Sequence, residues 1–128
     1  MIIGLKEFKK ANGRFDPVFK KLTHLHLENK GIEVIENLDK CTNLMTIYMQ
    51  ENSIYTLVNN PFQGLSKITQ LSLYDNKISK IEGFKDLVSL KKLYLEKNLI
   101  YKLEGLENCQ ALEELNLNNQ LVSDQMEF

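Results

Sequence analysis

The sequence has few of the residues on which catalysis, disulfide scaffolds and redox chemistry depend. It contains no tryptophan, two cysteines, two histidines and two prolines among 128 residues. Both histidines fall in one short segment, which leaves no base–nucleophile arrangement to propose. There is also no CxxC motif, phosphate-binding loop, nucleophile elbow or paired-carboxylate arrangement. We predict a protein that is not an enzyme, has no catalytic residues and holds no cofactor.

An excess of charge and a long hydrophobic run are also missing. Sixteen Lys and Arg residues stand against seventeen Asp and Glu residues, so the net charge is -1 and general attraction to nucleic acid or membranes is weak. No stretch approaches the roughly 18 apolar residues of a membrane span, and the apolar start at Met1–Leu5 is too short for a signal peptide. We expect one cytoplasmic domain with no nucleic-acid or membrane partner.

The charges are unevenly distributed along the chain. Residues 1–21 contain six cations and two anions, whereas residues 103–128 contain six anions and no cation. A basic end and an acidic end can orient a partner along the molecule. A solvated surface that happens to be polarised explains the pattern equally well.

The dominant feature of the sequence is an internal repeat. Its unit reads apolar-x-x-apolar-x-apolar-x-x-polar, and its starts lie 22, 24, 22 and 22 residues apart. The units begin at Leu22, Leu44, Ile68, Leu90 and Leu112. The alternating apolar residues predict a short strand with one buried face, and the later apolar residues, spaced by three, predict helical or 3-10 turns. Stacked units share one interior that no single unit can form alone.

This pattern predicts an α/β fold, a leucine-rich-repeat solenoid. A curved parallel sheet forms its concave face, and short helices or 3-10 turns form its convex face. Residues 22–128 make up the repeat domain of about five units. The second unit has two extra residues near Pro61, which we place on the convex loop because insertions are tolerated there.

A polar residue follows each predicted strand, at the point where the chain bends. Asparagine occupies this position at Asn52, Asn76 and Asn98. Its amide offers both donors and an acceptor to backbone groups that the bend leaves without partners. We therefore predict a structural asparagine ladder, with Lys30 and Gln120 in the two end units.

The two ends of the repeat domain differ. Residues 1–21 form a predicted basic capping segment, in which Asp16-Pro17 begins a helix. Its apolar residues are expected to seal the first unit; they are Val18, Phe19 and Leu22, with Phe8 and Phe15 as further members. Only Leu121–Phe128 follow the last unit, and they contain no amphipathic helix. A C-terminal cap is therefore missing, and we expect either a longer chain beyond Phe128 or a partner that covers this end.

The outward residues of the predicted strands form the candidate binding surface. They line the concave face in three columns. These are His24, Thr46, Gln70, Lys92 and Glu114; His26, Tyr48, Ser72, Tyr94 and Asn116; and Glu28, Gln50, Tyr74, Glu96 and Asn118. Three of the five tyrosines fall here, and tyrosine is favoured at protein interfaces. Strands also favour tyrosine for their own stability, but the open face favours a protein-binding role.

Two other residue groups resemble sites. His24, His26 and Glu28 form a two-histidine, one-carboxylate set, but same-face residues about 7 Å apart on one strand surround an ion poorly, so we predict contact residues and no metal. Cys41 and Cys109 share one repeat position three units apart, about 14 Å at strand spacing. A disulfide needs α-carbons within roughly 7 Å, so we predict two buried thiols.

The repeat resembles the SDS22-like class of leucine-rich repeats over about residues 22–122. The Ile-Glu signature of that class is matched by Ile35-Glu36-Asn37-Leu38, Ile81-Glu82-Gly83-Phe84 and Leu103-Glu104-Gly105-Leu106. The resemblance implies an intracellular module that binds partners on its concave sheet. Many members serve protein phosphatase 1, and others serve cilia, axonemes and centrosomes.

A narrower resemblance is to the testis and centrosomal family of leucine-rich-repeat regulatory subunits of protein phosphatase 1. It rests on Leu90–Leu95, Leu103–Glu107, Glu113-Glu114-Leu115 and Asn119-Gln120. Members of that family are longer than this chain, and the 24-residue second unit departs from their spacing. The resemblance implies a regulatory or scaffolding subunit of the phosphatase catalytic subunit. The alternative it implies is a structural component of the cilium, axoneme or centrosome that binds tubulin or dynein components.

Overall fold

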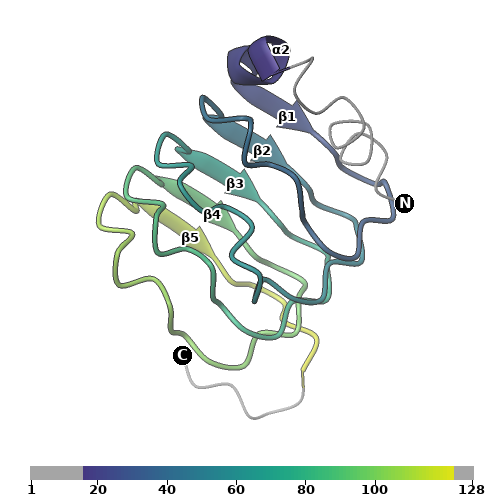
Figure 1. Cartoon of the computed structure of the whole chain (residues 1–128). Coiled ribbons are helices and arrows are strands. Elements are labelled where there is room, and N and C mark those ends of the chain that lie inside the picture. Colours follow the sequence, from purple (N-terminus) through teal and green to yellow (C-terminus); the bar gives the residue numbers. More distant parts are fainter. Residues whose placement is uncertain (1–15, 123–128) are drawn as a thin grey trace.

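The computed structural model describes residues 16–122, which form one short helix and one parallel sheet (Figure 1). The helix α2 covers Asp16–Lys21. The strands are β1 (His24–His26), β2 (Thr46–Tyr48), β3 (Gln70–Ser72), β4 (Lys92–Tyr94) and β5 (Glu114–Asn116). Their spatial order β1-β2-β3-β4-β5 is the sequence order. The fold is the predicted leucine-rich-repeat solenoid, with five strands and four complete turns between them.

The strands pair in register, so each repeat position forms a row across the sheet. Leu25 aligns with Ile47, Ile47 with Leu71, and Leu71 with Leu93. These four central side chains are buried, because alternate residues of a strand point to opposite faces. Figure 1 shows the return segments spread more widely than the strands, which places the sheet on the inner, concave side.

The return segments take the second of the two predicted forms, the 3-10 turn. Within residues 22–122 they contain no helix, and instead consecutive turns lead the chain into each strand. Backbone bonds from Leu87 to Phe84 and from Leu90 to Leu87, 3.1 and 3.2 Å long, show the i to i+3 pattern of 3-10 geometry. The same pattern links Cys41 to Leu38. Apolar residues three apart therefore produce 3-10 turns, which are one of the two forms that the sequence predicts.

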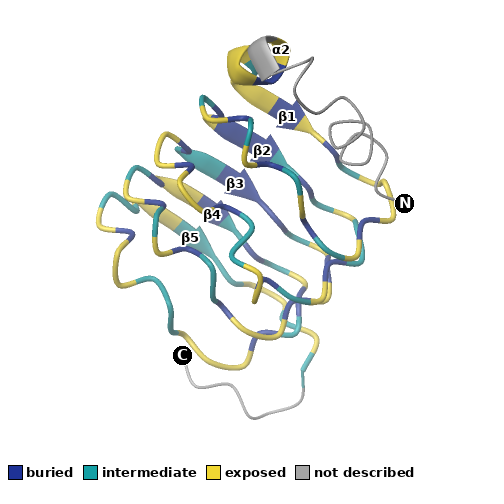
Figure 2. Ribbon diagram, in the orientation of Figure 1, coloured by how far each residue is buried: buried dark blue, intermediate teal, exposed yellow. Residues whose placement is uncertain are grey.

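One hydrophobic core runs through the whole stack. The dark-blue buried positions in Figure 2 recur along the strands and along the return segments. The two extra residues of the second unit lie in a return segment of successive turns, as predicted, and Phe62 from that segment is fully buried. The Phe62 and Phe84 rings stack with centroids 6.0 Å apart. The irregular unit therefore joins the common core through an aromatic residue.

The N-terminal end is partly closed by α2. Phe19 is buried and Leu22 packs against the core, as predicted. Val18 is 56% exposed, so its predicted sealing role is wrong. A six-residue helix with Phe19 facing the core presents the preceding side chain to solvent, because neighbours in a helix point in different directions. Phe8 and Phe15 lie outside the described residues.

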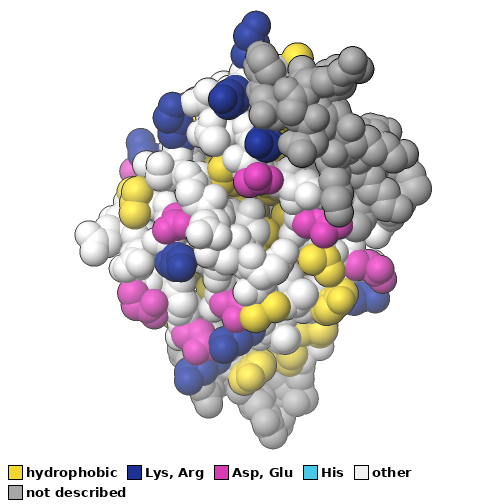
Figure 3. Space-filling view, viewed as in Figure 1, with side chains coloured by type: hydrophobic (Ala, Val, Ile, Leu, Met, Phe, Trp, Pro, Cys, Tyr) yellow, Lys and Arg dark blue, Asp and Glu magenta, His cyan; other side chains and the backbone are white. Residues whose placement is uncertain are grey.

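The C-terminal end of the described chain is less well covered. Leu112, Leu115 and Leu117 are only partly buried, whereas Leu90, Leu93 and Leu95 at the same repeat positions are fully buried. Figure 3 shows apolar side chains gathered near the loops of the last units.

No helix in the described range has the length and apolar character that a membrane span requires.

Candidate partner-binding face

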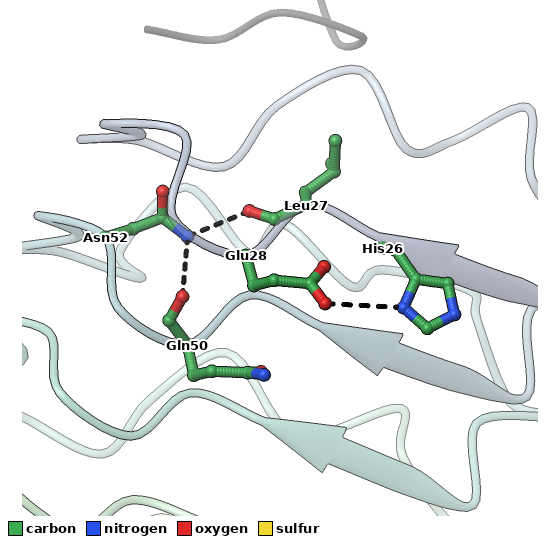
Figure 4. Close-up of polar contacts among 5 residues, drawn as sticks. All are labelled: His26, Leu27, Glu28, Gln50 and Asn52. Carbon is green, nitrogen blue, oxygen red and sulfur yellow. Dashed lines mark hydrogen bonds and ion pairs between the residues drawn. The ribbon is translucent and has the colours of Figure 1, made fainter.

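The bend after each strand is held by the predicted amide ladder. The Asn76 side-chain oxygen accepts a bond of 2.9 Å from the Ile54 amide, and its Nδ2 donates to the carbonyls of Met49 and Leu73. Asn98 makes the equivalent set to the Ile78 amide and to two carbonyls. Asn52 bonds to Leu27 and Gln50 in the same way (Figure 4). The asparagine prediction is confirmed.

Both end units take part in this ladder. Gln120 replaces the asparagine, and its longer side chain still accepts from the Ile100 amide at 2.9 Å and donates to the Leu95 carbonyl at 2.7 Å. At the other end the Lys30 amide donates to the Asn52 oxygen at 2.8 Å. The residue before each ladder position has a positive φ, as at Glu51 and Lys97. These tight bends come directly after the third-column residues, so they end each run of concave side chains.

The structure places the fifteen predicted contact residues at three depths. His24, His26, Lys92, Glu114 and Asn118 are exposed. The half-buried group is Glu28, Tyr48, Gln50, Gln70, Tyr74, Tyr94, Glu96 and Asn116. Thr46 and Ser72 are buried. The three tyrosines therefore lie on the sheet surface without entering the core.

The first two strands bring a histidine, a tyrosine and a carboxylate together. His26 and Tyr48 are register partners, and their rings stack with centroids 4.6 Å apart and 14° between planes. The Glu28 oxygen lies 3.5 Å from His26 Nδ1 (Figure 4). His24 instead contacts the Thr23 hydroxyl at 3.0 Å. The two histidines thus have separate partners, and residues 16–122 contain no cluster of three metal-ligating side chains.

The row that begins with His26 and Tyr48 continues with a serine in β3 and a tyrosine in β4. Ser72 aligns with Tyr48 on one side and with Tyr94 on the other, and it is only 4% exposed. A small side chain between two large ones is shielded by them. Burial raises the pKa of Tyr94, and its hydrogen bond to Glu114 and the charges of Glu114 and Glu96 raise that pKa further. Tyr94 is therefore held as a neutral donor among carboxylates.

Sequence reasoning missed two features, one on the concave face and one in the return segments. The Gln50 Oε1 and Glu96 Oε1 atoms are buried and have no hydrogen-bond partner. Both belong to the third column, on either side of Tyr74. Other asparagines also bind backbone carbonyls of the preceding unit, as Asn59 does to Ile35 at 2.9 Å. Asn59 lies next to the two-residue insertion near Pro61, where the repeat pattern does not predict side-chain contacts.

The cysteines are structural. Cys41 and Cys109 are free and buried, as predicted. Burial and the nearby Asp39 raise the pKa of Cys41 to about 11. Burial and then Glu107 raise the pKa of Cys109. Both thiols therefore stay protonated and unreactive near neutral pH.

The repeat geometry and the amide ladder define the fold as a leucine-rich-repeat solenoid. Residues 42–100 match the family described as Leucine rich repeat. Proteins of this family and fold are typically non-enzymatic modules that mediate protein–protein interaction. No curated protein matches the chain.

Solved structures of similar fold belong to longer proteins. The internalin inlF of Listeria monocytogenes is 28% identical with a TM-score of 0.63, over 84% of this chain and 38% of that chain. TLR13, solved in complex with ssRNA13, is 30% identical with a TM-score of 0.74, over 84% of this chain and 17% of that chain. Internalin C2 of the same bacterium is 24% identical with a TM-score of 0.58, over 85% of this chain and 57% of that chain, and shows the fold alone. The chain thus spans less than two thirds of each.

Proposed function

We propose that this protein is a non-enzymatic regulatory or scaffolding subunit that binds a globular protein on its concave face. The observation that carries the proposal is the row His26, Tyr48, Ser72 and Tyr94, in which stacked or half-buried rings lie on an open sheet surface. Such rings offer large contact areas at low entropic cost, together with polar tips. Rigid strands hold them in position before a partner arrives.

The proposed partner is the catalytic subunit of protein phosphatase 1, in the cytoplasm. The SDS22-like signature supports this choice. A nucleic-acid partner is less well supported, although TLR13 was solved with ssRNA13. The three columns contain Glu28, Glu96 and Glu114 but only one lysine, Lys92. A face with more carboxylates than cations repels phosphates.

The test is a pull-down from cell extract with the full chain and two matched variants. The first changes Tyr48, Tyr74 and Tyr94 to Ala. The second changes Tyr55 and Tyr101, the two tyrosines exposed outside the concave columns, to Ala. The first variant should lose the main partner and the second should retain it. Unchanged binding by a correctly folded first variant contradicts the proposal.

A second candidate function is a structural role in the cilium, axoneme or centrosome, with tubulin or dynein components as partners. The uneven charge favours it, because residues 103–122 carry Glu104, Glu107, Glu113 and Glu114 without any cation. Retention of a tagged copy on detergent-extracted axonemes supports this role. A diffuse cytosolic signal with the phosphatase bound supports the first role.

A further inference from the structure

The third column of the concave face holds acceptor atoms that no group in the described chain satisfies. Glu96 Oε1 and Gln50 Oε1 are buried and have no hydrogen-bond partner. Buried polar atoms are normally paired, and an unpaired carboxylate oxygen is costly. The other concave carboxylates have partners, since Glu28 lies beside His26 and Glu114 accepts from Tyr94. Glu96 therefore differs from the other two concave carboxylates, because one of its oxygens is buried and accepts no hydrogen bond.

Backbone bonds place these two acceptors on either side of one tyrosine. The Glu51 amide donates to the Tyr74 carbonyl at 3.0 Å, and the Asp75 amide donates to the Glu96 carbonyl at 2.9 Å. Gln50, Tyr74 and Glu96 are therefore neighbours in three successive units. Tyr94 lies two residues before Glu96 on the same face of the chain. Glu96 is consequently adjacent to two tyrosines, Tyr94 of its own unit and Tyr74 of the unit before.

This arrangement fits a planar cation with several donors. A guanidinium stacks on aromatic rings, presents five N–H groups in a fixed plane and is more weakly hydrated than an ammonium. The ring of Tyr74 between the two acceptors favours arginine over lysine, because a planar guanidinium stacks on a ring and the compact ammonium of lysine does not. The excess of carboxylates among the fifteen concave residues, three against the single cation Lys92, favours a basic segment as the occupant.

We propose that the concave face seats an arginine side chain of its protein partner against Tyr74, where the half-buried side chains of Glu96 and Gln50 turn outward to accept its N–H groups. The inference rests on the proposed function, because it names the chemistry by which the same surface recognises a partner. Glu96 supplies the charge and one acceptor. Gln50 supplies the neutral acceptor, and the tyrosine rings exclude water from the contact.

The first experiment is an NMR titration of the 128-residue chain with N-acetyl-arginine amide. Saturable shifts are expected at the amides of Tyr74, Asp75, Glu96 and Lys97, with a dissociation constant on the order of 1–10 mM. The citrulline analogue has nearly the same shape without the charge and should cause no saturable shift. The lysine analogue should bind more weakly. No saturable shift with arginine, or equal binding of the lysine analogue, overturns the arginine assignment.

Matched variants then locate the contact. Glu96→Gln should weaken the arginine probe about tenfold or more, because it removes the charge with little change of shape. Glu33→Gln makes the same chemical change at an exposed residue outside the three columns and should have no effect. Equal weakening by both variants, or by neither, overturns the inference. The dispersion of each spectrum shows that the variant is folded.

A pull-down separates this inference from the proposed function. If the triple tyrosine variant loses its partner and Glu96→Gln retains it at full strength, the concave interface stands and the arginine site is wrong. If both variants lose the partner, both proposals are supported. If neither loses it, both are contradicted.

Discussion

A ladder asparagine connects three stretches of backbone at once. Asn76 is 4% exposed and bonds to the Ile54 amide and to the carbonyls of Met49, Leu73 and Tyr74. Asn76→Ala should lower the free energy of unfolding by about 1–3 kcal/mol, because it leaves buried backbone groups unpaired. Urea denaturation followed by circular dichroism measures the change. Asn118→Ala, at an exposed position, serves as the control, and an equal loss there contradicts the role of the ladder.

The raised pKa of the Cys41 thiol predicts how the free energy of unfolding depends on pH. Its pKa is raised from 9.0 to about 11, so the folded state prefers the neutral thiol. The stabilisation that comes from this neutral thiol is fully present below pH 9. It is lost as the pH rises towards 11, because the cysteine of the unfolded chain ionises at a lower pH than that of the folded chain. Urea unfolding of the native chain and of Cys41→Ala across this range isolates the effect. A constant difference between the two proteins at all pH values rules it out.

At the scale of the turn, two glycines with similar dihedral angles make a matched pair. Gly105 and Gly64 have φ of 77° and 78°. A β-carbon on Gly105 would collide with the Ile81 carbonyl oxygen, whereas one on Gly64 would meet nothing within 4 Å. Gly105→Ala should therefore destabilise the fold by about 2–4 kcal/mol, and Gly64→Ala by about 1–2 kcal/mol. Thermal denaturation compares the two variants. Equal losses of stability would show that only the strained backbone angle matters and that the collision with the Ile81 carbonyl does not.

At the scale of the strand and the turn, the sequence predicted the sheet better than the return segments. Buried residues such as Leu71 and Leu93 follow the two-residue period of a strand, and this period determines both the register and the concave columns. A spacing of three, as between Leu87 and Leu90, is compatible with a helix or with 3-10 turns, so the pattern alone did not decide between them.

The sequence did not predict how deeply each side chain of the candidate site is buried, and the reason is physical. The repeat tells which residues face outward, but their depth depends on the size of neighbours in other units. Ser72 is buried because it lies between Tyr48 and Tyr94, which are 24 and 22 residues away in the chain. The unpaired oxygen of Glu96 is equally a property of three adjacent units.

In the whole molecule, each unit is stabilised mainly by its immediate neighbours. The Glu114 amide donates to the Lys91 carbonyl. The Gln70 amide, at the same repeat position two units earlier, donates to the Met45 carbonyl. Leu112 and Leu115 beside Glu114 are only partly buried, whereas Ile68 and Leu71 are fully buried. Hydrogen exchange should therefore be at least about tenfold faster at Glu114 than at Gln70. Equal protection would show that the last unit is covered as well as the central ones.

The central claim is that the molecule contacts its partner through the concave sheet. Site-specific photo-crosslinking tests this most directly, with p-benzoylphenylalanine placed singly at Tyr94 or at Tyr101 in the full chain. Tyr94 lies on the sheet, and Tyr101 is exposed outside the concave columns. We predict that irradiation in cell extract gives a covalent adduct of one defined mass from position 94 and none from position 101. An adduct from position 101 alone would contradict the account.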